Sequence, residues 1–244
     1  MAKLFVVGLG PGAPGGITRR AWEVLRDCDL IAGYTAYVGL VRPLFPDKPV
    51  FTTGMRQETE RVRAALELAA QGKAVALVCS GDAGVYGMSG PALELAGNYP
   101  GVEVEVVPGV SAVLSGAALL GAPLMHDFAV VSLSDLLTPW ETIERRLRGA
   151  AAADFVICLY NPASRNRPEH LKRACDILLD YISPDRPCGI VRNVGRAGES
   201  LRVLTLAELR EAEVDMFCTV FIGNSQTKVV NGKLVTPRGY AHEN

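Results

Sequence analysis

The first half of the chain alternates short apolar runs with longer segments in which apolar residues recur every three or four positions. Runs of the first kind predict buried strands, and segments of the second kind predict amphipathic helices. Strands are expected at 3–8, 29–32, 50–53, 74–79 and 102–107, and helices at 18–28, 34–44, 56–71, 88–96 and 110–120. This alternation is typical of βαβ units with a parallel sheet.

The rhythm changes at the Gly-Ala-Pro sequence of residues 121–123. Beyond it, strands are expected at 128–133, 154–160, 187–193, 201–204 and 216–222, and helices at 140–148, 168–181 and 206–211. Less helix separates these later strands, which predicts a mixed sheet. We therefore expect two α/β domains, a parallel-sheet domain at 1–121 and a mixed-sheet domain at 122–244.

Composition narrows the classes of protein to consider. Of 244 residues, 49% are hydrophobic and 21% charged, which is enough to build a packed core. The net charge of −1 argues against a general nucleic-acid binder. Six scattered cysteines and three unclustered histidines predict a reduced protein without a metal site. No apolar run is long enough for a membrane span, and the first strand begins without a cleavage region, so we expect a cytoplasmic location.

The most informative loop is Ser80–Gly87, which follows the apolar strand at 74–79. In an open α/β sheet, ligands bind beyond the carboxyl ends of the strands. Asp82 lies at such an end, and Gly81 and Gly84 let the backbone come close to a ligand. The plain alternative is that Asp82 caps the next helix and the glycines only turn the chain.

A second glycine-rich loop, Gly8–Gly15, follows the first strand. It matches the dinucleotide pattern G-x-G-x-x-G/A, but Pro11 and Pro14 delay the helix that this pattern requires. No Gly-Lys-Ser/Thr follows, so the loop is not a Walker A motif. We interpret it as a rigid loop that closes over a cleft.

Several further loops carry polar side chains at strand ends. Ser111 follows the strand at 102–107 and is either a helix cap or a neighbour of Asp82, if the two strands are adjacent. The later strands lead into loops that contain Asp135, Arg165, Arg167, Arg192 and Arg196. The arginines suit carboxylate ligands as well as they suit a solvated turn. His126 and Asp127 lie at the expected domain junction, where clefts form.

In this order, the motifs resemble the tetrapyrrole methyltransferases of cobalamin and sirohaem synthesis. The resemblance rests on the Gly-x-Gly-Pro-Gly start, Ser-Gly-Asp-x-Gly-x-Tyr-Gly, Val-Pro-Gly-Val-Ser-Ala and Ile-Gly-Asn-Ser-Gln-Thr at 222–227. Within the family, the segments 132–140, 159–162 and 191–193 are similar to the precorrin-3B C17-methyltransferases of the ring-contraction step.

The resemblance implies a two-domain fold that binds S-adenosylmethionine in a cleft between the domains, usually as a homodimer. Carried over by position, the cofactor contacts are Pro11, Ser80, Gly81, Asp82, Val85, Ser111, Ala112, Leu159 and Val194. Asp82 is then an orienting contact to the cofactor. The chain departs from the family where relatives often have proline at Ala83 and aspartate at Ala13, so no catalytic role is given to position 13.

The same resemblance implies methylation of C17 of precorrin-3B, or of its cobalt counterpart, coupled to ring contraction. His126, Asp127 and Asp135 are candidate proton-transfer groups, and Arg165, Arg167, Arg192 and Arg196 suit the substrate carboxylates. Three alternatives stay open: methylation of another corrin carbon, methylation of RNA or diphthamide, and non-catalytic binding of a tetrapyrrole or nucleotide. A dinucleotide oxidoreductase would predict saturable NAD(P) binding, which we expect to be absent.

Overall fold

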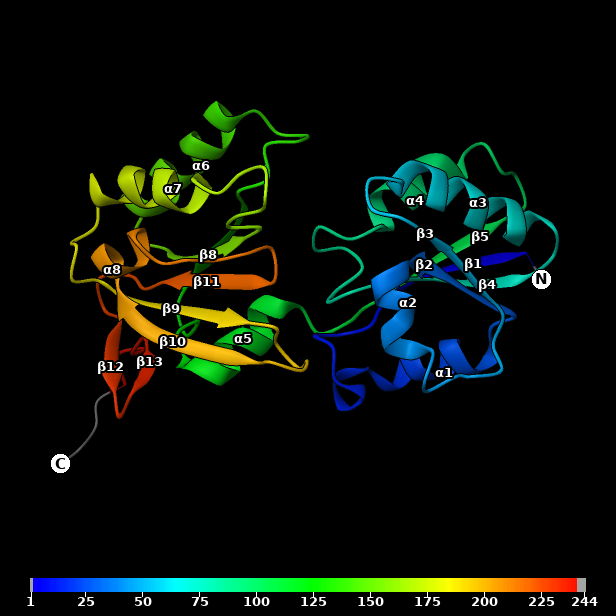
Figure 1. The fold of residues 1–244 in the computed structure, drawn as a ribbon, viewed down its shortest axis with the longest axis horizontal. Coiled ribbons are helices and arrows are strands. Elements are labelled where there is room, and N and C mark those ends of the chain that lie inside the picture. The colour runs from blue at the N-terminus through cyan, green and yellow to red at the C-terminus, as the bar shows by residue number, and fades with distance from the viewer. Residues whose placement is uncertain (1, 241–244) are drawn as a thin grey trace. The chain divides into compact units, whose positions relative to one another are not determined.

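The computed structural model describes residues 2–240, and the chain forms two compact units that divide between Ala112 and Val113. Each unit contains its own five-stranded sheet and its own hydrophobic core (Figure 1). No helix in the described range is both long and apolar enough to cross a membrane.

The first unit is built around a parallel sheet, as the alternating pattern predicts. Its strand order is β3 (Val50–Thr53), β2 (Leu30–Tyr34), β4 (Ala74–Cys79), β1 (Lys3–Gly8) and β5 (Glu103–Val107). Every pairing is parallel, so all five strands end at the same edge.

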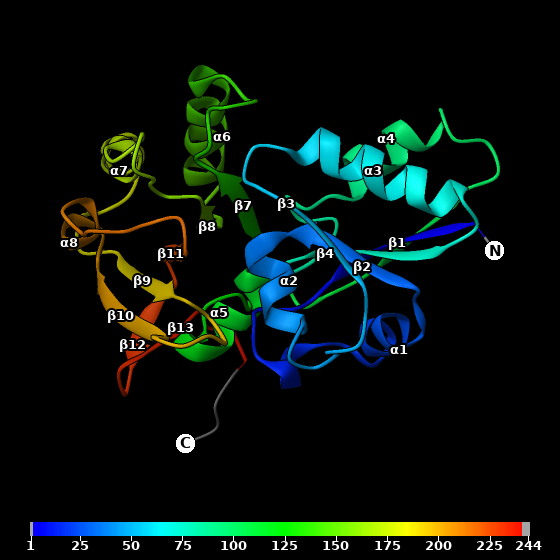
Figure 2. The ribbon, with the colours of Figure 1, turned by 45° about the vertical axis from the view of Figure 1, so that its right-hand side comes forward.

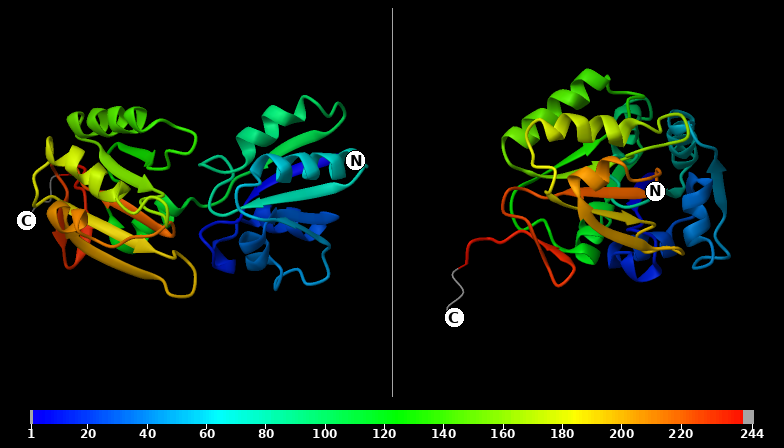
Figure 3. Two further views of the ribbon diagram at one scale, coloured as in Figure 1. Left: turned by 45° about the horizontal axis from the view of Figure 1, so that its top comes forward. Right: turned by 60° about the vertical axis from the view of Figure 1, so that its left-hand side comes forward.

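Helices cover both faces of this sheet (Figure 3). The helices α1 (Arg19–Asp27) and α2 (Thr35–Val41) pack their apolar residues on one face, and α3 (Glu58–Ala70) and α4 (Ser89–Ala96) pack on the other. The near-continuous apolar strand β4 follows from this arrangement, because both of its faces are buried.

The second unit contains the expected mixed sheet. Its order is β10 (Ser200–Thr205), β9 (Pro187–Arg192), β11 (Cys218–Ile222), β8 (Val156–Tyr160) and β7 (Phe128–Ser132). The strands β7 and β8 are parallel, whereas β11 runs antiparallel to both of its neighbours and β10 runs antiparallel to β9.

One face of the second sheet is covered by α6 (Trp140–Ala152), α7 (His170–Leu179) and α8 (Leu206–Arg210) (Figure 2). The other face packs on α5 (Ala112–Leu120) and on a small sheet ordered β12 (Lys228–Val230), β13 (Lys233–Val235) and β6 (Gly121–Ala122). The apolar pattern of the sequence predicts neither these three short strands nor the 3₁₀ turn at Pro14–Gly16.

The division between the units differs from the expected boundary near residue 121, because α5 packs with the second unit. Its residues Val113, Ala117 and Leu120 share a buried cluster with Phe221 and Leu234. Apolar periodicity shows that α5 has a buried face, but it does not show which sheet that face covers.

All six cysteines are buried thiols, and burial raises the pKa of Cys79 to about 11 and that of Cys175 to about 12. Since the thiolate is the reactive form, we expect the native chain to react slowly with a disulfide reagent at about pH 8. After denaturation, all six thiols should react. Release of thionitrobenzoate from Ellman's reagent measures both states, and rapid reaction of a native thiol would contradict this packing.

Candidate functional site

Three loops of the first unit converge at the edge where its strands end. Gly10, in the loop after β1, forms an isolated bridge with Gly81, in the loop after β4. The two residues exchange backbone hydrogen bonds of 3.0 Å and 2.8 Å. Gly81 also lies beside the loop after β5, since a Cβ built on it would be 3.7 Å from the backbone nitrogen of Ala112.

This convergence requires glycine because backbone packs directly on backbone. A Cβ at Gly8 would lie 2.6 Å from the nitrogen of Gly109 and 2.7 Å from the carbonyl oxygen of Gly81, closer than atoms can approach. The strands β4 and β5 are not neighbours, because β1 lies between them. Their loops meet across the end of β1, at Gly8.

The Asp82 carboxylate ties two of these loops together. Its Oδ1 accepts hydrogen bonds from the backbone N–H groups of Gly84, at 2.8 Å, and Val85, at 3.2 Å. Its Oδ2 accepts from the N–H of Gly109, at 2.9 Å. A carboxylate can accept about four hydrogen bonds. The backbone N–H groups of Gly84, Val85 and Gly109 already occupy three of these positions. Asp82 therefore organises the backbone of the site, and it does not cap the next helix, because α4 begins at Ser89 after Met88.

The other candidates of this unit surround that junction. Pro11 follows Gly10 directly, and Ser80 precedes Gly81. Ser111 is buried, with 7% exposure, whereas Val85 is 39% exposed and can contact a ligand through its side chain. The structure thus brings together all seven candidate cofactor residues of the first unit, although they come from three separate parts of the sequence.

In the second unit, the candidate loops follow β7, β8 and β9 at a single edge of the mixed sheet. Ser132 of β7 pairs with Tyr160 of β8. Val220 of β11 pairs with Leu159 of β8 on one side and with Ile190 of β9 on the other. The loops after β8 and β9 each begin with asparagine in the left-handed region, Asn161 with φ 52° and Asn193 with φ 54°. Asparagine tolerates this conformation better than most residues, so each chain turns sharply at the sheet edge.

Asp135 contacts a histidine that the sequence interpretation did not select. Its Oδ2 lies 3.1 Å from Nε2 of His170, the first residue of α7, and its Oδ1 lies 3.9 Å from Nε of Arg167. The adjacent imidazole of His170 lowers the pKa of the Asp135 carboxyl below its ordinary value. A carboxylate with a lowered pKa is a weaker base, which argues against proton abstraction by Asp135.

The four candidate arginines differ in their availability. Arg167 donates to the carbonyl oxygen of Leu133 at 3.3 Å, and only 14% of its side chain is exposed. Arg192 is paired with Asp215 through two hydrogen bonds, of 3.0 Å and 2.8 Å. Within the described range, Arg165 is exposed and makes no such contact, so it is the freest cation of this edge. The backbone of Arg196 closes the turn that follows Asn193.

Two candidate proton-transfer residues lie at the opposite edge of this sheet. His126 and Asp127 precede β7, and the carbonyl oxygen of Asp127 accepts a hydrogen bond from Val156, the first residue of β8. Five residues of strand separate this edge from the one that holds Asp135, a span of about 13 Å. Within the second unit, the structure therefore does not bring His126 and Asp127 together with Asp135 and the candidate arginines.

Leu159 and Val194, the remaining cofactor candidates, have buried side chains, with 0% and 8% exposure. Leu159 packs in the core of the second unit, and Val194 packs in the cluster around α5. A ligand at this edge could therefore contact Leu159 only through its backbone.

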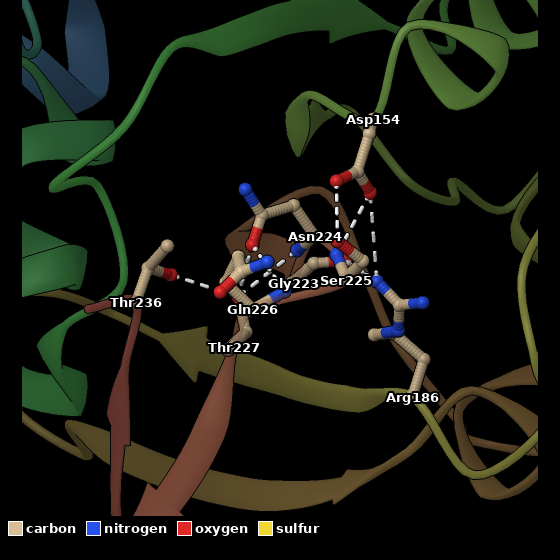
Figure 4. Close-up of polar contacts among 8 residues, drawn as sticks. All are labelled: Asp154, Arg186, Gly223, Asn224, Ser225, Gln226, Thr227 and Thr236. Carbon is tan, nitrogen blue, oxygen red and sulfur yellow. Dashed lines mark hydrogen bonds and ion pairs between the residues drawn. The ribbon is translucent and has the colours of Figure 1, made fainter. Parts of the chain in front are cut away.

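The motif at residues 222–227 lies at the same edge as His126 and forms a polar clasp (Figure 4). Asp154 accepts hydrogen bonds from the backbone and the hydroxyl of Ser225, at 2.8 Å and 2.6 Å. The buried hydroxyl of Thr227 lies 2.7 Å from that of Thr236, which in turn donates to the carbonyl oxygen of Pro123. The motif thus joins the end of β11 to two other parts of the unit, which is a structural role.

The Asp82 contacts lead to a stability prediction. We expect Asp82→Ala to lower the free energy of unfolding by roughly 2–3 kcal/mol, because three backbone donors lose a charged acceptor. Asp82→Asn keeps one acceptor oxygen for Gly84 and Val85 and should cost less. Urea denaturation measures both variants. Asp47→Ala, in an exposed loop of the same unit, is the matched control, and equal stability of the Asp82→Ala and control variants would contradict the proposed tie.

The sequence matches the family of tetrapyrrole (corrin/porphyrin) methylases over residues 3–210. It is 49% identical over 238 residues to a probable cobalt-factor III C(17)-methyltransferase of Salmonella typhimurium, a match that covers 97% of this chain and 99% of that relative. It is 46% identical over 243 residues to the cobalt-factor III methyltransferase of Priestia megaterium, covering 98% of this chain and 45% of that longer relative.

Solved structures agree with the sequence matches. The crystal structure of the methyltransferase CobJ has a TM-score of 0.89 and 36% identity, and the match covers 96% of this chain and 99% of that one. A uroporphyrin-III C-methyltransferase from Thermus thermophilus, complexed with S-adenosylhomocysteine, shares the fold with a TM-score of 0.69 and 24% identity, over 91% of this chain and 97% of that one. By its sequence and its fold, the chain belongs to the tetrapyrrole (corrin/porphyrin) methylase family.

Proposed function

We propose that this chain transfers a methyl group from S-adenosylmethionine to C17 of precorrin-3B or its cobalt counterpart, coupled to contraction of the ring in cobalamin biosynthesis. The proposal rests on two relatives named for this reaction, at 49% and 46% identity across nearly all of this chain. The CobJ structure, at 36% identity, supports the same type of methyltransferase.

The observation that carries the cofactor assignment is the convergence of three loops in the first unit. The family resemblance gives contacts to Pro11, the segment at 80–85 and the segment at 111–112, and the Gly10–Gly81 bridge and the Asp82–Gly109 hydrogen bond hold these segments together. Glycine-lined backbone and the half-exposed Val85 suit a small ligand that carries both polar groups and an apolar part.

S-adenosylmethionine supplies an electrophilic methyl group, and the electron-rich macrocycle supplies the carbon that attacks it. The protein therefore needs chiefly to position the two reactants, and correct positioning can supply much of the rate. In our proposal, the first unit holds the cofactor through backbone groups that Asp82 organises. Arg165 binds a substrate carboxylate at the edge of the second unit, and neither His126 nor Asp127 transfers a proton.

Turnover under anaerobic conditions tests the reaction. The purified chain, incubated with S-adenosylmethionine and either cobalt-factor III or precorrin-3B, should release S-adenosylhomocysteine and shift the absorption spectrum of the tetrapyrrole. With a ¹³C-labelled methyl donor, nuclear magnetic resonance should place the new methyl group on C17. A methyl group on another carbon would favour the alternative corrin methyltransferase, and binding without release would favour a non-catalytic protein.

The arginines give a second test, of substrate binding. We expect Arg165→Glu to raise KM for the tetrapyrrole by about tenfold or more, because a free cation that meets a carboxylate becomes a repelling charge. Arg192→Glu should have a smaller effect on KM, since Arg192 is already paired with Asp215. Steady-state kinetics compare the two variants, and equal effects would show that the pairing does not decide which arginine binds substrate.

We also infer that the chain works as a homodimer in the cytoplasm. The dimer comes from the family resemblance, and the location comes from the six scattered cysteines, which favour a reducing compartment. Light scattering measures the mass in solution, and a monomer at micromolar concentration would contradict the dimer.

A further inference from the structure

The loop between β7 and α6 exposes two adjacent leucines. Leu136 is 64% exposed and Leu137 is 99% exposed, the largest exposure among the large hydrophobic side chains of the described residues. A single exposed leucine is ordinary on a protein surface. Two in sequence, at the tip of a loop that begins at the candidate edge of the sheet, indicate a surface that contacts another molecule.

Polar contacts fix this loop at its base. Ser132, at the end of β7, accepts hydrogen bonds through Oγ from Nδ2 of Asn161, at 2.9 Å, and from the backbone of Ser134, at 3.2 Å. Arg167 donates to the carbonyl oxygen of Leu133 and lies near Asp135. The loop after β7 is thus attached to the loop after β8 at both Ser132 and Leu133.

The contact between Asp135 and His170 holds the loop directly before the two leucines. His170 is 7% exposed, and its Nε2 is shielded from solvent and lies 3.1 Å from the Asp135 carboxylate. Its ring packs edge-on against Trp140, with the ring centroids 5.0 Å apart. The guanidinium of Arg173 covers the Trp140 ring at 4.1 Å. Because Trp140 begins α6, one buried histidine fixes both the middle and the end of the loop.

We propose that Leu136 and Leu137 form the apolar contact for the face of the tetrapyrrole substrate, and that His170 is a positioning residue that holds them in place through Asp135. The proposal rests on the proposed function for the identity of the substrate. His170 itself is too deeply buried to touch a ligand, so it acts only through the loop.

The chemistry of this edge favours a tetrapyrrole over other occupants. The macrocycle has a broad apolar face with carboxylates around its rim. The loop offers an apolar tip, and the adjoining loop after β8 offers the exposed cation Arg165. An apolar tip on one loop and an exposed cation on the loop attached to it complement that ligand.

The test uses the double variant Leu136→Ala and Leu137→Ala in the full-length chain. Because both side chains are exposed, the melting temperature should stay unchanged. We expect KM for the tetrapyrrole to rise by about tenfold or more, with unchanged affinity for S-adenosylmethionine. Leu93→Ala, a leucine with 54% exposure on α4, is the matched control and should leave both values unchanged.

The outcomes separate this proposal from the proposed function. If the wild-type chain fails to methylate the tetrapyrrole, both proposals fail. If the wild type methylates it and the double variant has the same KM, only the loop proposal is overturned. A variant whose mass in solution falls from dimer to monomer would also overturn it, because the leucines would then be a contact between subunits.

His170→Ala tests the positioning role. We expect KM for the tetrapyrrole to rise several-fold while the affinity for S-adenosylmethionine stays unchanged. His170→Gln should restore part of the loss, because its amide can donate to Asp135. If His170 had only a structural role, the variant would have a lower melting temperature, and its binding of the tetrapyrrole would not be affected more than its binding of S-adenosylmethionine. If His170→Ala does not fold, Asp135→Ala removes the same contact from the exposed side, and an unchanged KM in that variant would overturn the role of His170.

Discussion

Direct packing of backbone on backbone at the end of β1 is the constraint on which the first unit depends. Gly8 and Gly109 leave no room for side chains between the loops that they join, and Gly81 has a φ of 67°, which favours glycine. Asp82 then supplies the acceptor that these close backbones need, since a crowded loop cannot orient all of its N–H groups towards water. The glycines and the carboxylate therefore act together: the glycines allow the loops to approach closely, and the hydrogen bonds to Asp82 fix the orientation of the loops.

In the second unit, the direction of the strands sorts the polar residues into two groups. Side chains that follow β7, β8 and β9 gather at the edge with Arg165, Asp135 and His170, whereas the opposite edge holds the clasp of Asp154, Ser225 and Thr227. A conspicuous sequence motif can therefore serve the fold while less conspicuous loops carry the candidate chemistry. Position on the sheet distinguishes the two more reliably than composition does.

Much of this architecture could be predicted from the sequence, because apolar runs and periodic segments report burial directly. The parallel sheet, the mixed sheet and most helices follow from those patterns. The sheet on which α5 packs could not be predicted from the sequence, since the periodicity of a helix shows only that it has a buried face. The hairpin of β12 and β13 was missed although Asn231-Gly232 is a typical signal of a two-residue turn, and both residues have positive φ.

The candidate site was predicted less completely than the fold. The convergence around Asp82 could be expected from strand ends, but the use of its oxygens by backbone donors depends on loop geometry that the residue types do not encode. His170 was missed because a single histidine at a helix start carries no pattern of its own. Its partner, Asp135, is 35 residues away in sequence, and only the parallel pairing of β7 with β8 makes the two adjacent.

The position of β11 has a consequence for how the chain forms during synthesis. This strand lies in the middle of the second sheet, between β9 and β8, yet it is the last of the five to leave the ribosome. Until residue 222 is available, the sheet has a gap at its centre, and the two halves on either side expose unpaired strand edges. The first unit needs no such late strand, because its five strands are complete by residue 107. The order of the strands thus imposes an order of folding, with the second unit exposed to mispairing until its central strand arrives.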